Sequence, residues 1–76
     1  MINAYIFLVT EPEIKPEDIS AKFLKNKNVK DIVAVYGKYD ATLKVSFDNL
    51  TDLNNFLKEM RKIDWIKESK HYIAQE

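Results

Sequence analysis

The chain has 76 residues, of which 46% are hydrophobic and 32% are charged, with no Cys and a single His. A domain this small hides only about 60% of the surface that its unfolded chain exposes. Because the chain has no Cys and only one His, disulfides and a His-rich metal site cannot stabilise it, and we expect self-association to do so. Twelve basic residues balance twelve acidic ones, which excludes the broad positive field of non-specific nucleic-acid binders, and we expect no direct DNA binding.

The sequence contains no segment suited to crossing a membrane. Its longest apolar run, Ala4 to Val9, is far too short to span a bilayer, and residues 1–4 lack the basic charge that opens a signal peptide. We therefore predict a cytoplasmic protein without membrane contact.

The N-terminal half predicts a strand followed by a helix. Ile2 to Thr10 alternates, but both of its faces are apolar, which indicates an interior strand covered on each side. Pro16 followed by two acids is typical of a helix start, and Ile19 and Phe23 form its apolar stripe, so a helix should run from there to about residues 26–28. The two faces of the first strand carry these residues: Ala4, Ile6 and Leu8 on one, Tyr5, Phe7 and Val9 on the other.

The C-terminal half predicts a hairpin, a helix and a final strand. Val29 to Tyr36 and Asp40 to Phe47 have strand patterns, and the short connection between them contains the only Gly of the chain. Asp48 or Asn49 can cap the next helix. A last strand should cover about Trp65 to Ala74. The second helix has a clean apolar stripe: Leu50, Leu53, Phe56, Leu57, Met60 and Ile63.

This order of elements predicts an α+β domain of the ferredoxin-like βαββαβ type. Right-handed crossovers favour a four-stranded antiparallel sheet with both helices on one face. One apolar face of the first strand must then lie on the uncovered side of the sheet. Because a monomer seldom leaves so large an apolar patch in water, we expect a dimer of the α/β-barrel type, formed through that face.

The chain offers little of the chemistry that an enzyme requires. It has no Cys nucleophile, no glycine-rich phosphate loop, no metal-ligand spacing and no second His to act with His71. We therefore predict a protein that is not an enzyme and uses no cofactor or metal. The strand from Asp40 to Phe47 also lacks the aromatic motif with which RNA-recognition modules of this topology stack bases.

The turn from Tyr36 to Asp40 is the one local feature with a second interpretation. Gly37 suits a position that needs a positive φ, so the sequence is explained by turn chemistry alone. A tight turn with exposed backbone groups and the Asp40 carboxylate could also hold a zwitterion.

Two motifs give the chain a resemblance to a known family. Gly37-Lys38-Tyr39-Asp40 leads into an alternating strand, and residues 48–56 read Asp-Asn-Leu-Thr-Asp-Leu-Asn-Asn-Phe. Together with the order of elements, they resemble the regulatory domain of the leucine-responsive/asparagine (Lrp/AsnC) regulators, over nearly the whole chain. The family's pattern for this helix start is Asp-Leu-x-x-Leu-x-x-Phe, and the present chain has one additional residue between the Asp and the first Leu.

The resemblance implies a module that senses small effectors and is linked to transcription regulation of amino-acid metabolism. It implies a homodimer that assembles further, to an octamer, with an amino acid or a similar metabolite bound between dimers. Family members usually carry a helix-turn-helix before this domain, whereas Met1 here directly precedes the first strand, so we expect a stand-alone form that could associate with a DNA-binding family member. The ligand-binding residues that the resemblance implies are Tyr36, Gly37, Lys38, Tyr39, Asp40, Tyr72, Ile73 and Ala74.

Two alternatives share this topology. The first is a small cofactor-free enzyme of the dimeric α/β-barrel type, a monooxygenase or isomerase. The second is the amino-acid-binding ACT domain, which is disfavoured because residues 10–15 contain no Gly for an effector to approach. The enzyme would use a cavity between the sheet and the helices, lined by His71, Trp65, Tyr5 and Asn3.

Overall fold

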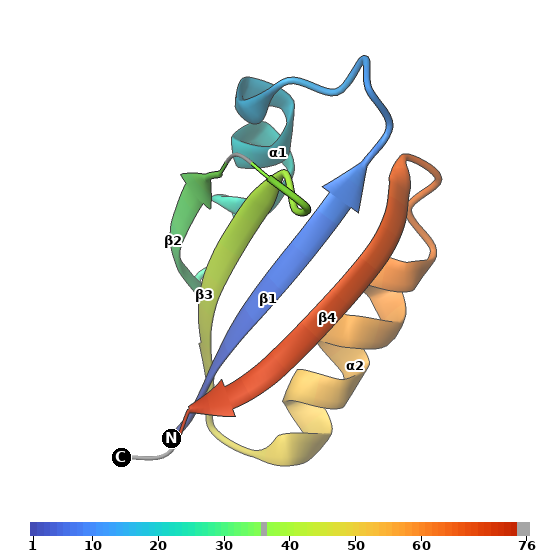
Figure 1. Cartoon of the computed structure of the whole chain (residues 1–76). Helices are drawn as coiled ribbons and strands as arrows, with labels where there is room; N and C mark the ends of the chain where they lie inside the picture. Colours follow the sequence, from blue (N-terminus) through green and yellow to red (C-terminus); the bar gives the residue numbers. More distant parts are fainter. Residues whose placement is uncertain (36, 75–76) are drawn as a thin grey trace.

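The computed structural model describes residues 1–35 and 37–74 and confirms the predicted ferredoxin-like fold. This part of the chain forms four strands and two helices in the order βαββαβ (Figure 1). In chain order they are β1 (Ile2–Thr10), α1 (Pro16–Phe23), β2 (Val29–Ala34), β3 (Ala41–Phe47), α2 (Leu50–Arg61) and β4 (Ile66–Ala74).

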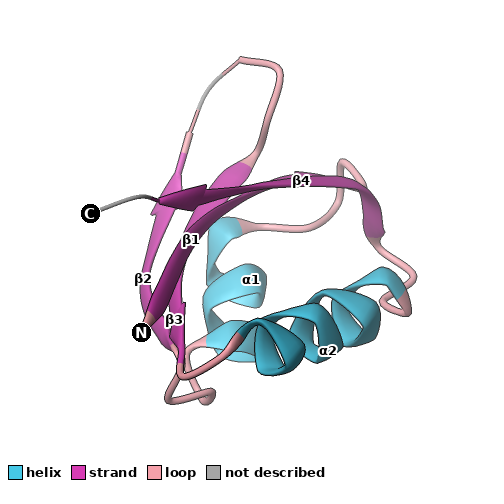
Figure 2. Ribbon diagram, turned by 90° about the horizontal axis from the view of Figure 1, so that it is seen from below, coloured by secondary structure: helices cyan, strands magenta, loops and turns pink. Residues whose placement is uncertain are grey.

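The strands form one antiparallel sheet in the order β2-β3-β1-β4. β1 is interior, as its two apolar faces predict, and it pairs with β3 on one side and with β4 on the other. Both helices lie on the same side of the sheet (Figure 2). The other side, which we call the open face, is therefore left without a covering layer of helices.

The core lies between the helices and one face of β1. The alternation of β1 left open which face this would be, and the structure shows that Ala4, Ile6 and Leu8 are completely buried there. Ile19 and Phe23 of α1 pack on this core, as the predicted stripe requires. The remaining buried apolar residues come from β2, β3 and α2: Val29, Ala41, Leu43, Val45, Phe47, Leu53, Leu57 and Met60.

Helix α1 is shorter than predicted. It ends at Phe23 instead of residues 26–28, because the chain enters a turn in which the Asn26 backbone N–H donates to the Phe23 carbonyl at 3.0 Å. The Asn26 side-chain oxygen then accepts from the Asn28 N–H at 2.8 Å. Asn side chains compete with the helix for backbone groups in this way, which explains the early end.

Helix α2 begins where its cap predicts. Of the two candidate caps it is Asn49 whose side chain accepts from the Asp52 N–H, at 2.9 Å. The predicted apolar stripe is buried at Leu53, Leu57 and Met60, but Leu50 is 47% exposed. Leu50 is the first residue of the helix and projects beyond the core, so its place in the buried stripe was wrong. Neither helix in the described residues has the length and apolar character needed to span a membrane.

Candidate functional site

Strands β2 and β3 form a hairpin, as the sequence predicts. Gly37 has a φ of +121°, a conformation that L side chains rarely adopt, which explains why Gly stands there. The Val35 N–H donates to the Asp40 carbonyl at 3.1 Å and closes the loop. Tyr36, which was predicted to bind the ligand, lies outside the described residues.

Asp40 ties this hairpin to the end of β1. Its Oδ2 accepts from the Thr10 N–H at 2.8 Å, and its own N–H donates to the Leu8 carbonyl at 2.7 Å. The carboxylate therefore has a structural role that the sequence did not reveal. Oδ1 remains as the oxygen that could meet the ammonium group of an effector.

An aromatic row joins two of the predicted ligand residues. The Phe7 ring lies 5.4 Å from the Tyr39 ring and 5.7 Å from the Tyr72 ring, centroid to centroid. Lys38 extends the row, since its Nζ lies 5.6 Å from the Tyr39 centroid, within range of a cation–π contact. We call Tyr39, Phe7 and Tyr72 the aromatic row. Phe7 was not among the predicted ligand residues. Its alternation placed it on the same face of β1 as Tyr5, but its contact with Tyr39 of the loop has no sequence signal.

Ile73 and Ala74, the remaining predicted residues on β4, do not join the hairpin residues within one chain. Ala74 pairs with Asn3 at one end of β1, whereas Asp40 bonds to Leu8, five residues further along. At about 3.4 Å per residue, these two parts of the predicted site lie about 17 Å apart. Ile73 pairs with Ala4, so it shares the face of the sheet that carries the helices and not the face of Tyr72.

The open face exposes large apolar side chains next to charged ones, such as Lys44, which pairs with Tyr5. Tyr5 is 39% exposed, Val33 49% and Tyr72 58%. Between β2, β3 and β1 the face is hollowed by a depression of about 420 Å³. Its lining combines apolar side chains with one cation and one anion: Tyr5, Asp31, Val33, Val35, Thr42 and Lys44.

The four residues of the alternative enzyme do not line a common cavity. Tyr5 and Asn3 alternate with the buried Ala4 and so belong to the open face. Trp65 instead packs near Phe23, with ring centroids 6.4 Å apart, at the edge of the core. His71 is exposed on β4. These four side chains therefore cannot contact one substrate together within a single chain.

Comparison with known proteins places the chain among regulatory domains. The family model described as the Lrp/AsnC ligand binding domain matches residues 3–76. No curated protein matches the chain. The crystal structure of FFRP-DM1 is 37% identical, with a TM-score of 0.91, and the alignment covers 99% of this chain and 100% of that one. A hypothetical protein from Pyrococcus horikoshii, PHS023, is 36% identical, with a TM-score of 0.90 over 100% of this chain and 92% of that one.

A more distant structure has the same fold. The complex of a transcriptional regulator from Neisseria meningitidis with L-methionine gives a TM-score of 0.86 at 17% identity. The alignment covers 99% of this chain but only 50% of the regulator. The family model matches residues 3–76, which is nearly the whole chain. The chain therefore belongs to the Lrp/AsnC ligand-binding domain family.

Proposed function

We propose that this domain oligomerises and senses an amino acid or a similar small metabolite, which binds between dimers at the β2–β3 hairpin. The observation that carries the proposal is the separation of Asp40 from Ala74: Asp40 bonds to Leu8, whereas Ala74 pairs with Asn3, about 17 Å away along β1. A single small ligand cannot contact both Asp40 and Ala74 within one chain. It can contact both groups where the hairpin of one copy meets β4 of another.

The chemistry of the hairpin supports a zwitterionic ligand. Asp40 offers its second carboxylate oxygen to an ammonium group, while Lys38 and the exposed backbone of Gly37 can meet a carboxylate. The aromatic row supplies apolar surface beside these polar groups. A site closed between copies excludes water, which strengthens each charged hydrogen bond relative to the same bond on an open surface.

The open face supports dimerisation. It exposes Tyr5, Val33 and Tyr72 to solvent while no element of the described chain covers it. Packing two such faces against each other would bury both apolar surfaces and compensate for the small core of each chain. Further assembly of dimers, to an octamer, would create the sites between them.

A role in regulation follows from the same arrangement. The regulator from Neisseria meningitidis has this fold in half of its chain and was crystallised with L-methionine. We propose that the present domain likewise couples an amino-acid signal to transcription, through association with a DNA-binding family member and not through direct DNA contact.

Calorimetry with free amino acids tests the ligand site, and Asp40→Asn is the informative variant. The Asn oxygen can still accept from the Thr10 N–H, so the hairpin keeps its tie to β1 while the charge is lost. We expect the effector to bind the Asp40→Asn protein about tenfold to a hundredfold more weakly than the wild type, since a hydrogen bond to a charged group contributes about 1.5 to 3 kcal/mol.

Asp48→Asn is the matched control, because Asp48 is exposed and lies at the far end of β3. It makes the same change of charge away from the hairpin and should leave the affinity unchanged. Absence of binding by any common amino acid, or equal affinities in all three proteins, would rule out the site.

A further inference from the structure

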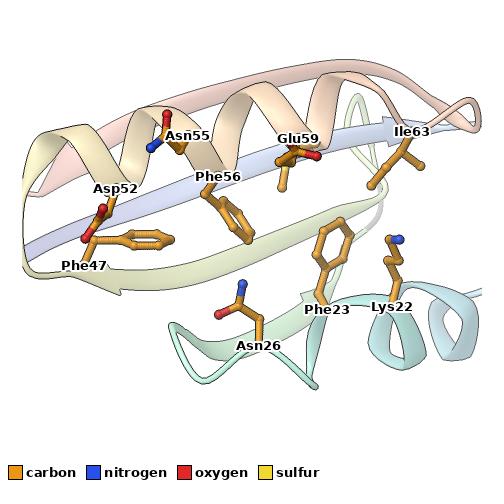
Figure 3. Close-up of a pocket in the computed structure, with 10 residues that line it drawn as sticks. Lys22, Phe23, Asn26, Phe47, Asp52, Asn55, Phe56, Glu59 and Ile63 are labelled. Atoms are coloured by element: carbon orange, nitrogen blue, oxygen red, sulfur yellow. The ribbon is translucent and has the colours of Figure 1, made fainter.

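A groove between the two helices lies on the side of the molecule away from the open face. It has a volume of about 400 Å³, within the range of small-molecule sites. Figure 3 shows its side chains, with Phe23, Phe56 and Phe47 in the space between α1 and α2. It shares no lining residue with the hairpin or with the depression on the open face.

The floor of this groove is aromatic. The Phe56 ring lies 5.3 Å from the Phe47 ring and 6.2 Å from the Phe23 ring, centroid to centroid. Phe23 and Phe47 are almost completely buried, while Phe56 is half-buried and faces the space between the helices. Rings in this arrangement present edges and faces to a further ring, which favours an aromatic ligand over an aliphatic one.

One wall of the groove carries hydrogen-bond donors. Asn26 is half-buried, and its Oδ1 accepts from the Asn28 N–H at 2.8 Å. That bond fixes the amide so that Nδ2, a donor only, points toward the aromatic floor (Figure 3). Lys22, one turn earlier, adds a positive charge, and the described residues place no acid within ion-pair distance of it.

The opposite wall carries acceptors. Asp52 and Glu59 line the groove from α2, two turns apart on the same side of the helix. Glu59 is paired with Lys62 at 3.3 Å, but both side chains are more than 70% exposed, so solvent weakens that pair. The two walls therefore have opposite charge, with an apolar floor between them.

From these features we infer that the groove is a second ligand site, and that it takes an aromatic zwitterion. The ring would lie on Phe23 and Phe56, the carboxylate would face Lys22 and the Asn26 amide, and the ammonium would face the α2 acids. This site goes beyond the proposed effector site, because it lies within one chain and needs no second copy.

Methyl NMR of the full chain tests the inference, because Met60 and Ile63 line the groove while Ile73 lies on β4. Three probes share one ring: L-phenylalanine carries both charges, phenylacetate only the negative one, and 2-phenylethylamine only the positive one. We expect L-phenylalanine to shift the Met60 and Ile63 methyl signals saturably, and the other two to bind about tenfold more weakly, because each loses one charged hydrogen bond.

Asn26→Asp is the decisive variant. The carboxylate can still accept from the Asn28 N–H, so the turn is retained, but the donor becomes a negative acceptor that repels the ligand's carboxylate. We expect binding of L-phenylalanine to weaken at least about tenfold. Asn54→Asp makes the same change at an exposed position of α2 outside the groove, and it should leave binding unchanged.

Four results would overturn the inference. Two concern the probes: equal binding of all three, or no shift of the groove methyls at the solubility limit of L-phenylalanine. The third is unchanged binding of L-phenylalanine to Asn26→Asp. The fourth is a shift of the groove methyls that depends on protein concentration alone, which would assign the groove to a second copy. Shifts confined to Ile73 would overturn the groove site and leave the proposed effector site standing. Shifts confined to Met60 and Ile63 would support the groove site, and the proposed effector site would then stand or fall on its own test with the other amino acids.

Discussion

At the scale of single residues, Asp40 illustrates how a ligand candidate can also be a structural residue. Its Oδ2 holds the Thr10 N–H, and Thr10 is buried, so removing the side chain leaves that N–H without its partner. We expect Asp40→Ala to lower the free energy of unfolding by about 1 kcal/mol and Asp40→Asn to change it by less than half of that. Urea denaturation at one fixed protein concentration measures both. Equal stability of Asp40→Ala and the wild type would show that the Thr10 bond contributes nothing.

The residue scale is also where the sequence was least informative. The positive φ of Gly37 was predictable, since only Gly adopts it without strain. The contact of Tyr39 with Phe7 and the bond from Thr10 to Asp40 depend on how the hairpin folds back on β1. These are long-range features without a local pattern, so the sequence could name the hairpin residues but not their partners.

At the scale of elements, the periodic signals predicted the structure well. The alternation from Ala41 to Phe47 showed which face of β3 is buried, because a one-residue shift of a strand would expose every apolar side chain. The stripe of α2 did the same for Leu53, Leu57 and Met60. Errors occurred at the ends, where turn residues such as Asn26 compete with the helix. The pairing of Ile73 with Ala4, which separates it from the hairpin, depends on sheet order and register and so required the structure.

Two leucines of α2 test the account at this scale, because they share one sequence pattern but differ in burial. Leu53 is completely buried and Leu50 is 47% exposed. We expect Leu53→Ala to lower the free energy of unfolding by about 2 to 5 kcal/mol, through lost contacts and the cavity left behind, and Leu50→Ala by less than about 1 kcal/mol. Urea denaturation of the two variants measures the difference. Similar losses in both would mean that Leu50 is buried in solution, for example by a partner.

At the scale of the whole molecule, the open face is the surface through which we propose that two chains pair. A charge placed there should prevent association, because burying an unpaired ammonium group costs several kcal/mol. We expect Tyr5→Lys to raise the dissociation constant of the dimer at least about tenfold. Leu24→Lys, at the residue that follows α1 and is 57% exposed, is the control and should associate like the wild type. Light scattering over a dilution series compares them, and unchanged association of Tyr5→Lys would remove the open face from the interface.

Effector-linked assembly is the central claim, and sedimentation velocity of the wild-type protein tests it most directly. A ligand that binds between dimers must favour the assembled state by its differential affinity for that state. We predict at least a dimer at micromolar concentration without additives, and a larger species when one of the common amino acids is added. A monomer whose sedimentation none of the amino acids changes would contradict the account.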